Sequence, residues 1–177
     1  MKFMAMFLGL LYAGYAMQAM AETQSPGKMT CKDFVALDDT VKPKVVYWAE
    51  GLNKKGKPVD SVVDVDETDK LVPVLVTECK DAPDQPLMKK ITEHAAQKPK
   101  VAAVAPKPMK MSCKEFVALD DVVKPKVVYW AEGYSKKGKP VDSVVDVDET
   151  DKLVPVLVTE CKETPKLTFW QKIKKHF

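Results

Sequence analysis

Residues 31–79 read CKDFVALDDTVKPKVVYWAEGLNKKGKPVDSVVDVDETDKLVPVLVTEC, and residues 113–161 repeat this stretch at an offset of 82 positions. With the lysine that follows each stretch, fifty positions can be compared. Only four of them differ, namely Asp33/Glu115, Thr40/Val122, Leu52/Tyr134 and Asn53/Ser135. A repeat of this length sets the number of structural units before any single residue is interpreted. The sequence therefore predicts two copies of one small domain.

The segments around the repeats complete this organisation. Residues 1–21 contain Lys2, an apolar run and the A-x-A sequence that ends at Ala21, a pattern typical of a cleaved signal peptide. A membrane anchor is the alternative, but the apolar run stops at Gln18, short of the roughly 20 residues that a spanning helix needs. We expect a signal peptide at 1–21, a short tail at 22–29, a first domain at 30–97, a Pro/Ala/Lys linker at 98–111 and a second domain at 112–177.

The four cysteines stand one at each end of each repeat. An exported chain enters an oxidising compartment, where cysteines form structural disulfides. Three pairings are possible, and the placement favours Cys31–Cys79 and Cys113–Cys161. No two cysteines are close in sequence, which argues against a zinc site or a thioredoxin-like redox site. Disulfides suit domains of this size, because so short a chain buries only a modest core.

Two helices can be placed at the start of each repeat. The spacing Ser112-x-x-Glu115 predicts a capping box, and Thr30-x-x-Asp33 a weaker one, at the start of a short helix. A second helix follows with Pro43 in its first turn. One apolar face of this helix is formed by Val45, Trp48, Ala49 and Leu52.

The second half of each repeat is ambiguous. Residues 61–66 alternate like a strand, and Leu71–Val76 is rich in β-branched residues. Pro73 would have to lie on an edge strand, whereas it suits the first turn of a helix. The pattern alone leaves both structures open and favours a helix.

The two copies diverge after their last cysteine. Residues 87–95 predict a weakly amphipathic helix, and residues 169–177 predict a stronger basic one. A basic amphipathic end of this kind can bind an anionic membrane surface, but packing on its own domain is the commoner outcome.

The residue types exclude several functions. All 28 basic residues are lysines, which disfavours nucleic-acid recognition, where arginine is preferred. An EF-hand loop that began at Asp64 would need Gly and Glu where Asp69 and Leu75 stand. The repeats contain no histidine, so they cannot hold a Ser-His-Asp triad. Carboxylate-pair chemistry remains open at this point, although nothing in the sequence singles out a pair.

The first repeat carries a longer pattern, Cys31-x-Asp33-Phe34-x-Ala36-x-Asp38-Asp39-x3-Pro43, then Ala49-Glu50-x-Leu52-Asn53-x-Lys55-x-Lys57-Pro58-x-Asp60, then Val63-Asp64-Val65, Pro73 and Cys79. Both repeats resemble the HdeA/HdeB family of periplasmic acid-stress chaperones in this pattern and in the spacing of the cysteines. The lysine-rich end at 170–175 is also similar to the end of that family's chains.

The resemblance implies an all-α fold, as two small disulfide-stapled domains in tandem. It also implies a protein with no enzymatic activity, no metal and no cofactor. It implies a periplasmic chaperone that pairs at neutral pH, loosens in strong acid and holds unfolding proteins, called clients, until the pH rises. The partners expected are acid-unfolded periplasmic proteins and an intramolecular pseudo-dimer of the two repeats, or a homodimer of chains, with no nucleic acid and no membrane surface. The alternative function is a pH-insensitive, bivalent binding module of the cell envelope.

The resemblance also assigns residues to these roles. The expected client-binding side chains are Val45, Trp48, Leu52, Val62, Val63 and Val65 in the first repeat and Val127, Trp130, Tyr134, Val144, Val145 and Val147 in the second. The expected pH-sensing carboxylates are Asp38, Asp39, Asp64, Asp66, Glu67, Asp69, Asp120, Asp121, Asp146, Asp148, Glu149 and Asp151. One departure is the charged stretch at 66–70, where HdeA is apolar, and the tandem arrangement is another.

Overall fold

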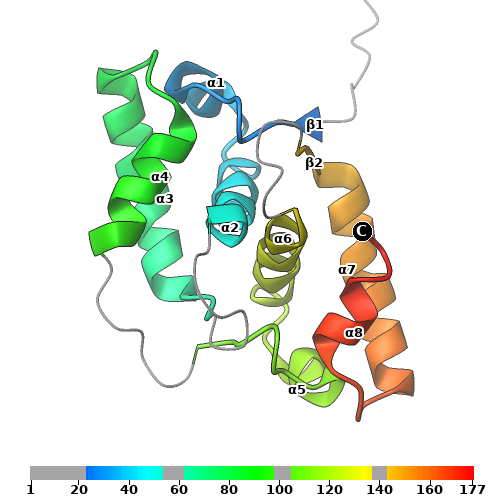
Figure 1. Cartoon of the computed structure of the whole chain (residues 1–177). Coiled ribbons are helices and arrows are strands. Elements are labelled where there is room, and N and C mark those ends of the chain that lie inside the picture. Colours follow the sequence, from blue (N-terminus) through cyan, green and yellow to red (C-terminus); the bar gives the residue numbers. More distant parts are fainter. Residues whose placement is uncertain (1–22, 54–61, 98–104, 137–142) are drawn as a thin grey trace, which may run out of the picture.

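The computed structural model describes residues 23–53, 62–97, 105–136 and 143–177 (Figure 1). In the first repeat the helices are α1 (Cys31–Ala36), α2 (Lys42–Asn53), α3 (Val65–Asp81) and α4 (Leu87–Gln97). In the second they are α5 (Cys113–Ala118), α6 (Lys124–Ser135), α7 (Val147–Glu163) and α8 (Phe169–Ile173). The described residues also contain the two-residue strands β1 (Thr23–Gln24) and β2 (Val145–Asp146). The predicted signal peptide, residues 54–61 after α2 and residues 98–104 of the predicted linker lie outside the described residues.

The short helices α1 and α5 begin at capping boxes. The Asp33 N–H donates to Thr30 Oγ1 at 3.3 Å, and the Thr30 N–H donates to Asp33 Oδ2 at 3.0 Å. Ser112 and Glu115 make the same two bonds at 3.2 and 2.7 Å. The pair in the first repeat is therefore as complete as that in the second, because an aspartate also reaches the N-cap backbone.

The ambiguous stretch of each repeat is helical. Helix α3 begins after Asp64, whose side chain accepts a hydrogen bond from the Glu67 N–H at 3.1 Å. The expectation that Pro73 lies in a first turn is wrong, because Pro73 is inside the helix. A proline there removes one backbone hydrogen bond. The helix continues past it because Pro73 is exposed, while buried side chains at Leu71, Leu75 and Cys79 hold the opposite face.

Each repeat is closed by a disulfide between its first and third helices. Cys31 is bonded to Cys79, and Cys113 to Cys161. The segment that leads into α4 then returns to the start of α1, where the Leu87 N–H donates to the Met29 carbonyl at 2.9 Å. Helix α4 thereby covers a small core whose first and third helices are joined by the disulfide.

Helices α2 and α6 lie side by side at the centre of the molecule (Figure 1). Helices α1, α3 and α4 lie on one side of this pair, and α5, α7 and α8 lie on the other. The sequence predicted one apolar face on α2, but the structure also buries Val46, Tyr47 and Gly51. The prediction was incomplete because α6 covers a second side of α2.

The extended segments that precede the two repeats cross over to the opposite repeat. Strand β1 pairs antiparallel with β2, so that Gln24 lies opposite Val145. In the other half, the Val63 N–H donates to the Pro106 carbonyl at 2.9 Å. Gln24 and Pro106 occupy equivalent positions, and so do Val63 and Val145, because each pair is separated by 82 residues. The exchange is therefore reciprocal.

The C-terminal helix packs on its own domain. Its side chains Phe169 and Ile173 are buried, and the Phe169 ring stacks on Phe116 with ring centroids 4.4 Å apart. The helix ends at Ile173, so Phe177 lies beyond it and is exposed. Among the residues that the structure describes, no helix is both long and apolar enough to cross a membrane.

Candidate functional site between the repeats

The closed structure covers most of the side chains that were expected to bind clients. Six of the twelve lie on α2 and α6, the helices that pack against each other. Eight are buried, namely Val45, Trp48, Leu52, Val63, Val127, Trp130, Val145 and Val147. The other four are half-buried, namely Val62, Val65, Tyr134 and Val144. In the closed structure these residues therefore offer no continuous exposed surface to a client.

Two glycines allow the backbones of α2 and α6 to touch. A Cβ atom on Gly51 would lie 2.0 Å from the Trp130 carbonyl oxygen. A Cβ atom on Gly133 would lie 1.9 Å from the Trp48 carbonyl oxygen. No side chain fits at these distances, so glycine is required at both positions for the helices to approach this closely. Neither glycine stands out in the sequence, because its partner lies in the other repeat.

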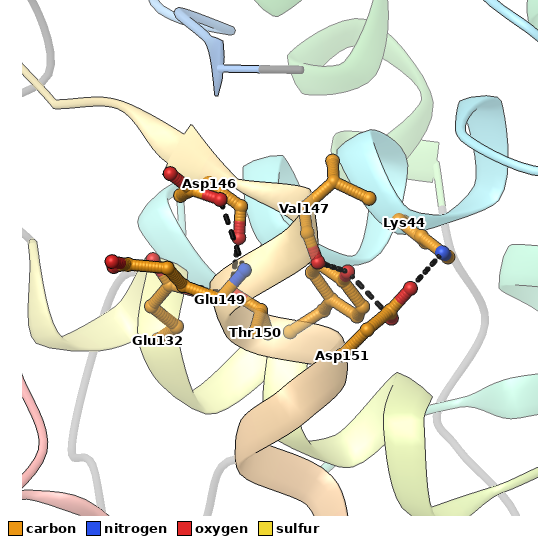
Figure 2. A network of polar contacts seen from close by, with 8 residues as sticks. Lys44, Glu132, Asp146, Val147, Glu149, Thr150 and Asp151 are labelled. Atoms are coloured by element: carbon orange, nitrogen blue, oxygen red, sulfur yellow. Dashed lines mark hydrogen bonds and ion pairs between the residues drawn. The ribbon is translucent and has the colours of Figure 1, made fainter. Parts of the chain in front are cut away.

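A polar network joins the repeats beside this contact (Figure 2). Lys44 of α2 donates to Asp151 of α7 at 2.6 Å, and its ammonium lies 5.9 Å from the centre of the Tyr129 ring. The Tyr129 hydroxyl donates to Asp151 at 2.9 Å and to the Val147 carbonyl at 3.0 Å. Burial, together with the bond to Asp151, raises the pKa of Tyr129, so this hydroxyl remains a proton donor.

The same network occurs at the equivalent position in the other half of the molecule. Lys126 of α6 donates to Asp69 at 2.5 Å, and the Tyr47 hydroxyl donates to Asp69 at 2.8 Å. Asp69 and Asp151 were expected to respond to pH, and the structure places both in ion pairs between the repeats. The lysines and tyrosines were missed, because nothing in the sequence pairs Lys44 with a carboxylate 107 positions away.

Glu132 is a buried carboxylate that the sequence analysis also missed. It is only 7% exposed, and it accepts a hydrogen bond from Thr150 Oγ1 at 2.7 Å. Burial raises the pKa of Glu132, while the Thr150 hydrogen bond, the Lys136 charge and the nearby Trp48 indole oppose that rise. The Trp48 N–H itself is buried and makes no hydrogen bond of ordinary geometry. Trp48 and Glu132 therefore lie close together across the contact between the repeats, and the hydrogen-bonding capacity of the indole N–H is not fully used.

Four exposed carboxylates have pKa values below their ordinary values. Hydrogen bonds from Lys42 and Lys124, and then the charges of these lysines, lower the pKa of Asp39 and of Asp121. Hydrogen bonds within the capping boxes lower the pKa of Asp33 and of Glu115. Asp39 and Asp121 were expected to sense pH, whereas Asp33 and Glu115 were recognised only as caps.

The remaining carboxylates of the expected set have several surroundings. Asp64 and Asp146 cap the N-termini of α3 and α7. The backbone carbonyls of Asp38 and Asp120 accept hydrogen bonds at the starts of α2 and α6. Glu67 pairs with Lys70 at 3.3 Å. Asp66, Asp148 and Glu149 are exposed, as are the side chains of Asp38 and Asp120. The structure therefore gathers only part of the expected set at the contact between the repeats.

The two histidines occupy equivalent positions, although the sequences around them have diverged. His94 Nε2 lies 3.1 Å from Glu78, and His176 Nε2 lies 3.3 Å from Glu160. A lysine also lies near each glutamate. In both repeats this group attaches the C-terminal segment to the long helix. Within the described ranges, no three His, Cys, Asp or Glu side chains gather in a way that would hold a metal ion.

Comparison with known proteins places this architecture in a family. The profile of the HdeA/HdeB family matches residues 4–89 and again residues 91–171. The chain is similar to the probable acid stress chaperone HdeA of Brucella ovis and that of Brucella abortus, each 42% identical over 62 residues, which cover 35% of this chain and 54% of the relative. It is also similar to the acid stress chaperone HdeA of Escherichia coli, 40% identical over 63 residues, which cover 35% of this chain and 57% of the relative.

Each of these matches spans little more than half the length of the relative and about one repeat of this chain. The family profile matches twice, once in each half, and together the two matches cover most of the chain. The duplicated all-α fold with one disulfide in each half agrees with those two matches. The chain belongs to the HdeA/HdeB family.

Proposed function

We propose that the protein is an acid-activated chaperone of the periplasm that holds unfolded proteins and prevents their aggregation. Family membership and the names of the relatives support this proposal. The observation that carries it is the burial of the expected client-binding residues on α2 and α6, where the repeats meet. An apolar surface that is hidden in the closed state and exposed on opening suits a chaperone that must be inactive at neutral pH.

The closed state is an intramolecular pseudo-dimer. Its support is the reciprocity of the contacts, in which each lysine–aspartate pair, each glycine contact and each extended segment has an equivalent in the other half. Equivalent surfaces that face each other are typical of two-fold pairing. The linker keeps the two repeats close together, so one chain is sufficient to form the pair.

Acid opens this pair by removing carboxylate charge. A carboxylate with a lowered pKa contributes stability above its ordinary pKa, and that stability is lost as the pH falls through its lower folded-state value. Asp33, Asp39, Glu115 and Asp121 belong to this class. Each is exposed, so each contribution is small. Protonation also removes the ion pairs of Asp69 and Asp151 between the repeats, while the lysines stay charged and repel one another.

Glu132 acts in the opposite direction. Its pKa is raised in the folded protein, so its contribution to stability is fully present below the ordinary pKa of glutamate and is lost as the pH rises through the raised value. Opening in acid therefore depends on the many exposed carboxylates and the two ion pairs between the repeats, and not on the most buried carboxylate. The disulfides limit how far each repeat unfolds once it opens.

The location that fits this function is the periplasm. The support is the signal-peptide pattern at 1–21, the two disulfides and the family. We expect the mature chain to begin at Glu22, which the intact mass of the purified protein measures. A mature chain that retains residues 1–21 would contradict this expectation.

Aggregation assays test the function directly. An unrelated periplasmic protein should stay in solution at about pH 3 when this chain is present, and should receive little protection at pH 7, because the carboxylates lose their charge only in acid. Equal protection at both pH values would show that the activity is not switched by acid. No protection at either pH would contradict the chaperone function. Tryptophan fluorescence during the same titration separates this function from the bivalent binding module, which has no need to change state in acid.

A further inference from the structure

In the closed protein, an extended arm from each repeat lies along a buried edge of the other repeat. Gln24 lies opposite Val145 in the β1–β2 pair. The Pro106 carbonyl accepts a hydrogen bond from the Val63 N–H at 2.9 Å. Both valines are fully buried, and each lies just before the long helix of its repeat. Val145–Asp146 is thus paired with a strand of the other repeat, and Val63 makes one equivalent backbone hydrogen bond to Pro106. We call residues 143–146 and 62–64 the edges.

The arms contact these edges through their backbones. The first arm has the polar sequence Thr23-Gln24-Ser25, and its regular pairing extends over only two residues. Pairing through the backbone does not depend on the side chains of the added strand, so an edge of this kind accepts extended segments of many sequences. A short polar arm is a weak occupant of an edge that carries buried valines.

We propose that each edge is a strand-addition site, on which an extended apolar segment of an acid-unfolded protein replaces the arm. The client segment pairs with the backbone of residues 143–146 or 62–64, and its apolar side chains pack on the valines of the same stretch. The arm is the intramolecular occupant of this site in the closed state. This inference rests on the proposed chaperone function and specifies how that chaperone takes its clients.

The two arms differ in how they are attached. The segment at 105–106 lies between α4 and α5, so folded helices precede and follow it. Thr23–Gln24 is followed by α1 and is preceded by the segment predicted to be a signal peptide. An arm that is attached at only one end gains more conformational freedom when it leaves its edge than an arm that is attached at both ends. It is therefore displaced more readily. The edge at Val145 is therefore the first to accept a client.

A covalent lock on this arm tests the inference. Gln24→Cys combined with Val145→Cys joins two residues whose backbones are paired. At about pH 3 the locked chain should hold about half as much client as the wild-type protein, since one of two edges stays occupied. Gln24→Ser combined with Val145→Cys is the matched control, because it carries the same change at the edge without the disulfide, and it should hold more client than the locked chain. A locked chain that holds as much client as the wild-type protein overturns the inference.

Hydrogen exchange of the unmodified protein provides a second readout. Backbone amides at 143–146 should exchange about tenfold more slowly when a client is bound in acid, because strand addition protects them. Unchanged exchange at 143–146 while a client is demonstrably bound overturns strand addition. A wild-type chain that holds no client in acid contradicts the chaperone function itself. Failure of strand addition and failure of the chaperone function therefore give different results.

Discussion

Gly51 and Gly133 set the distance between the two repeats. A methyl group at either position would lie within 2.0 Å of a backbone oxygen of the opposite helix, so no rotamer relieves the overlap. The backbone of the partner helix would have to move, and this contact joins the centres of the two repeats. Neither glycine has a role within its own repeat that a sequence pattern would show.

We predict that Gly51→Ala destabilises the closed state by about 1–3 kcal/mol, the range for overpacked sites, even though alanine favours helices. Urea denaturation at pH 7 measures the free energy, and the assay of client aggregation shows whether the variant has become active without acid. Ala95→Val, which adds bulk at an exposed position on α4, is the control. An unchanged free energy of unfolding in Gly51→Ala would contradict the close contact.

Glu132 gives a prediction with the opposite pH dependence. Its pKa is raised by burial, so its ionised form disfavours the folded state at neutral pH. Glu132→Gln removes this charge and can still accept the hydrogen bond from Thr150. We expect the variant to be more stable than the wild-type protein at pH 7 and to lose that advantage below the ordinary pKa of glutamate, about 4.3.

Urea denaturation at pH 7 and at about pH 4 measures this difference. The control is Glu163→Gln, an exposed position at the end of α7, where the same change should have little effect. A Glu132→Gln variant that is less stable than the wild-type protein at pH 7 would show that the carboxylate is needed in its ionised form.

Among single residues, the sequence predicted those whose partners are near in the chain. Thr30 and Asp33 are three positions apart, and their bonds follow from that spacing. Lys44 and Asp151 are 107 positions apart and come together only because one repeat packs on the other. The pattern within each repeat predicts the fold of that repeat, but it does not predict how the two repeats pack against each other.

At the scale of elements, the capping boxes connect helix formation to pH. The Asp33 and Glu115 side chains each close the first turn of a helix that carries one half of a disulfide. Their pKa values are lowered mainly by hydrogen bonds from the N-cap residue, so their contribution is lost as the pH falls through the lowered values.

We predict that Asp33→Ala combined with Glu115→Ala lowers stability at pH 7 by a few tenths to about 1 kcal/mol per cap, since both groups are exposed. The difference from the wild-type protein should shrink as the pH falls below about 4, where the wild-type carboxylates also lose their charge. Circular dichroism during urea titrations at both pH values measures it. The matched control is Asp81→Ala combined with Glu163→Ala, since these exposed side chains occupy equivalent positions at the ends of α3 and α7 and lie outside the capping boxes. A difference of the same size at pH 7 and in acid would contradict the role of these caps in the acid response.

The helix at 65–81 shows how far pattern reasoning extends at this scale. Alternation at 61–66 and a β-branched run at 71–76 are local features that a strand shares. The deciding facts are the disulfide to α1 and the buried side chains at every fourth position, which require a helical face. Only the resemblance to the HdeA/HdeB family separated these alternatives, because periodicity over so few residues does not.

At the scale of the whole molecule, the tandem converts an encounter between two domains into a contact within one chain. A short tether gives an effective concentration of order millimolar, so we expect the pair to form however dilute the chain is. The reciprocal arms add a second link between the repeats, at Val145 and at Val63. Closure after an acid pulse should therefore be fast and independent of protein concentration.

Sedimentation at pH 7 tests this organisation. We predict that the mature chain sediments as a monomer over a wide range of concentrations, because each repeat finds its partner within the same chain. Separately produced halves, residues 22–97 and 105–177, should associate with each other, because each keeps its arm and its central helix. Gly133→Ala in the second half should weaken that association, since its added methyl group would overlap the Trp48 carbonyl. If the intact chain instead forms a dimer that persists on dilution, the repeats pair between chains, and the two central helices that pack here come from different molecules.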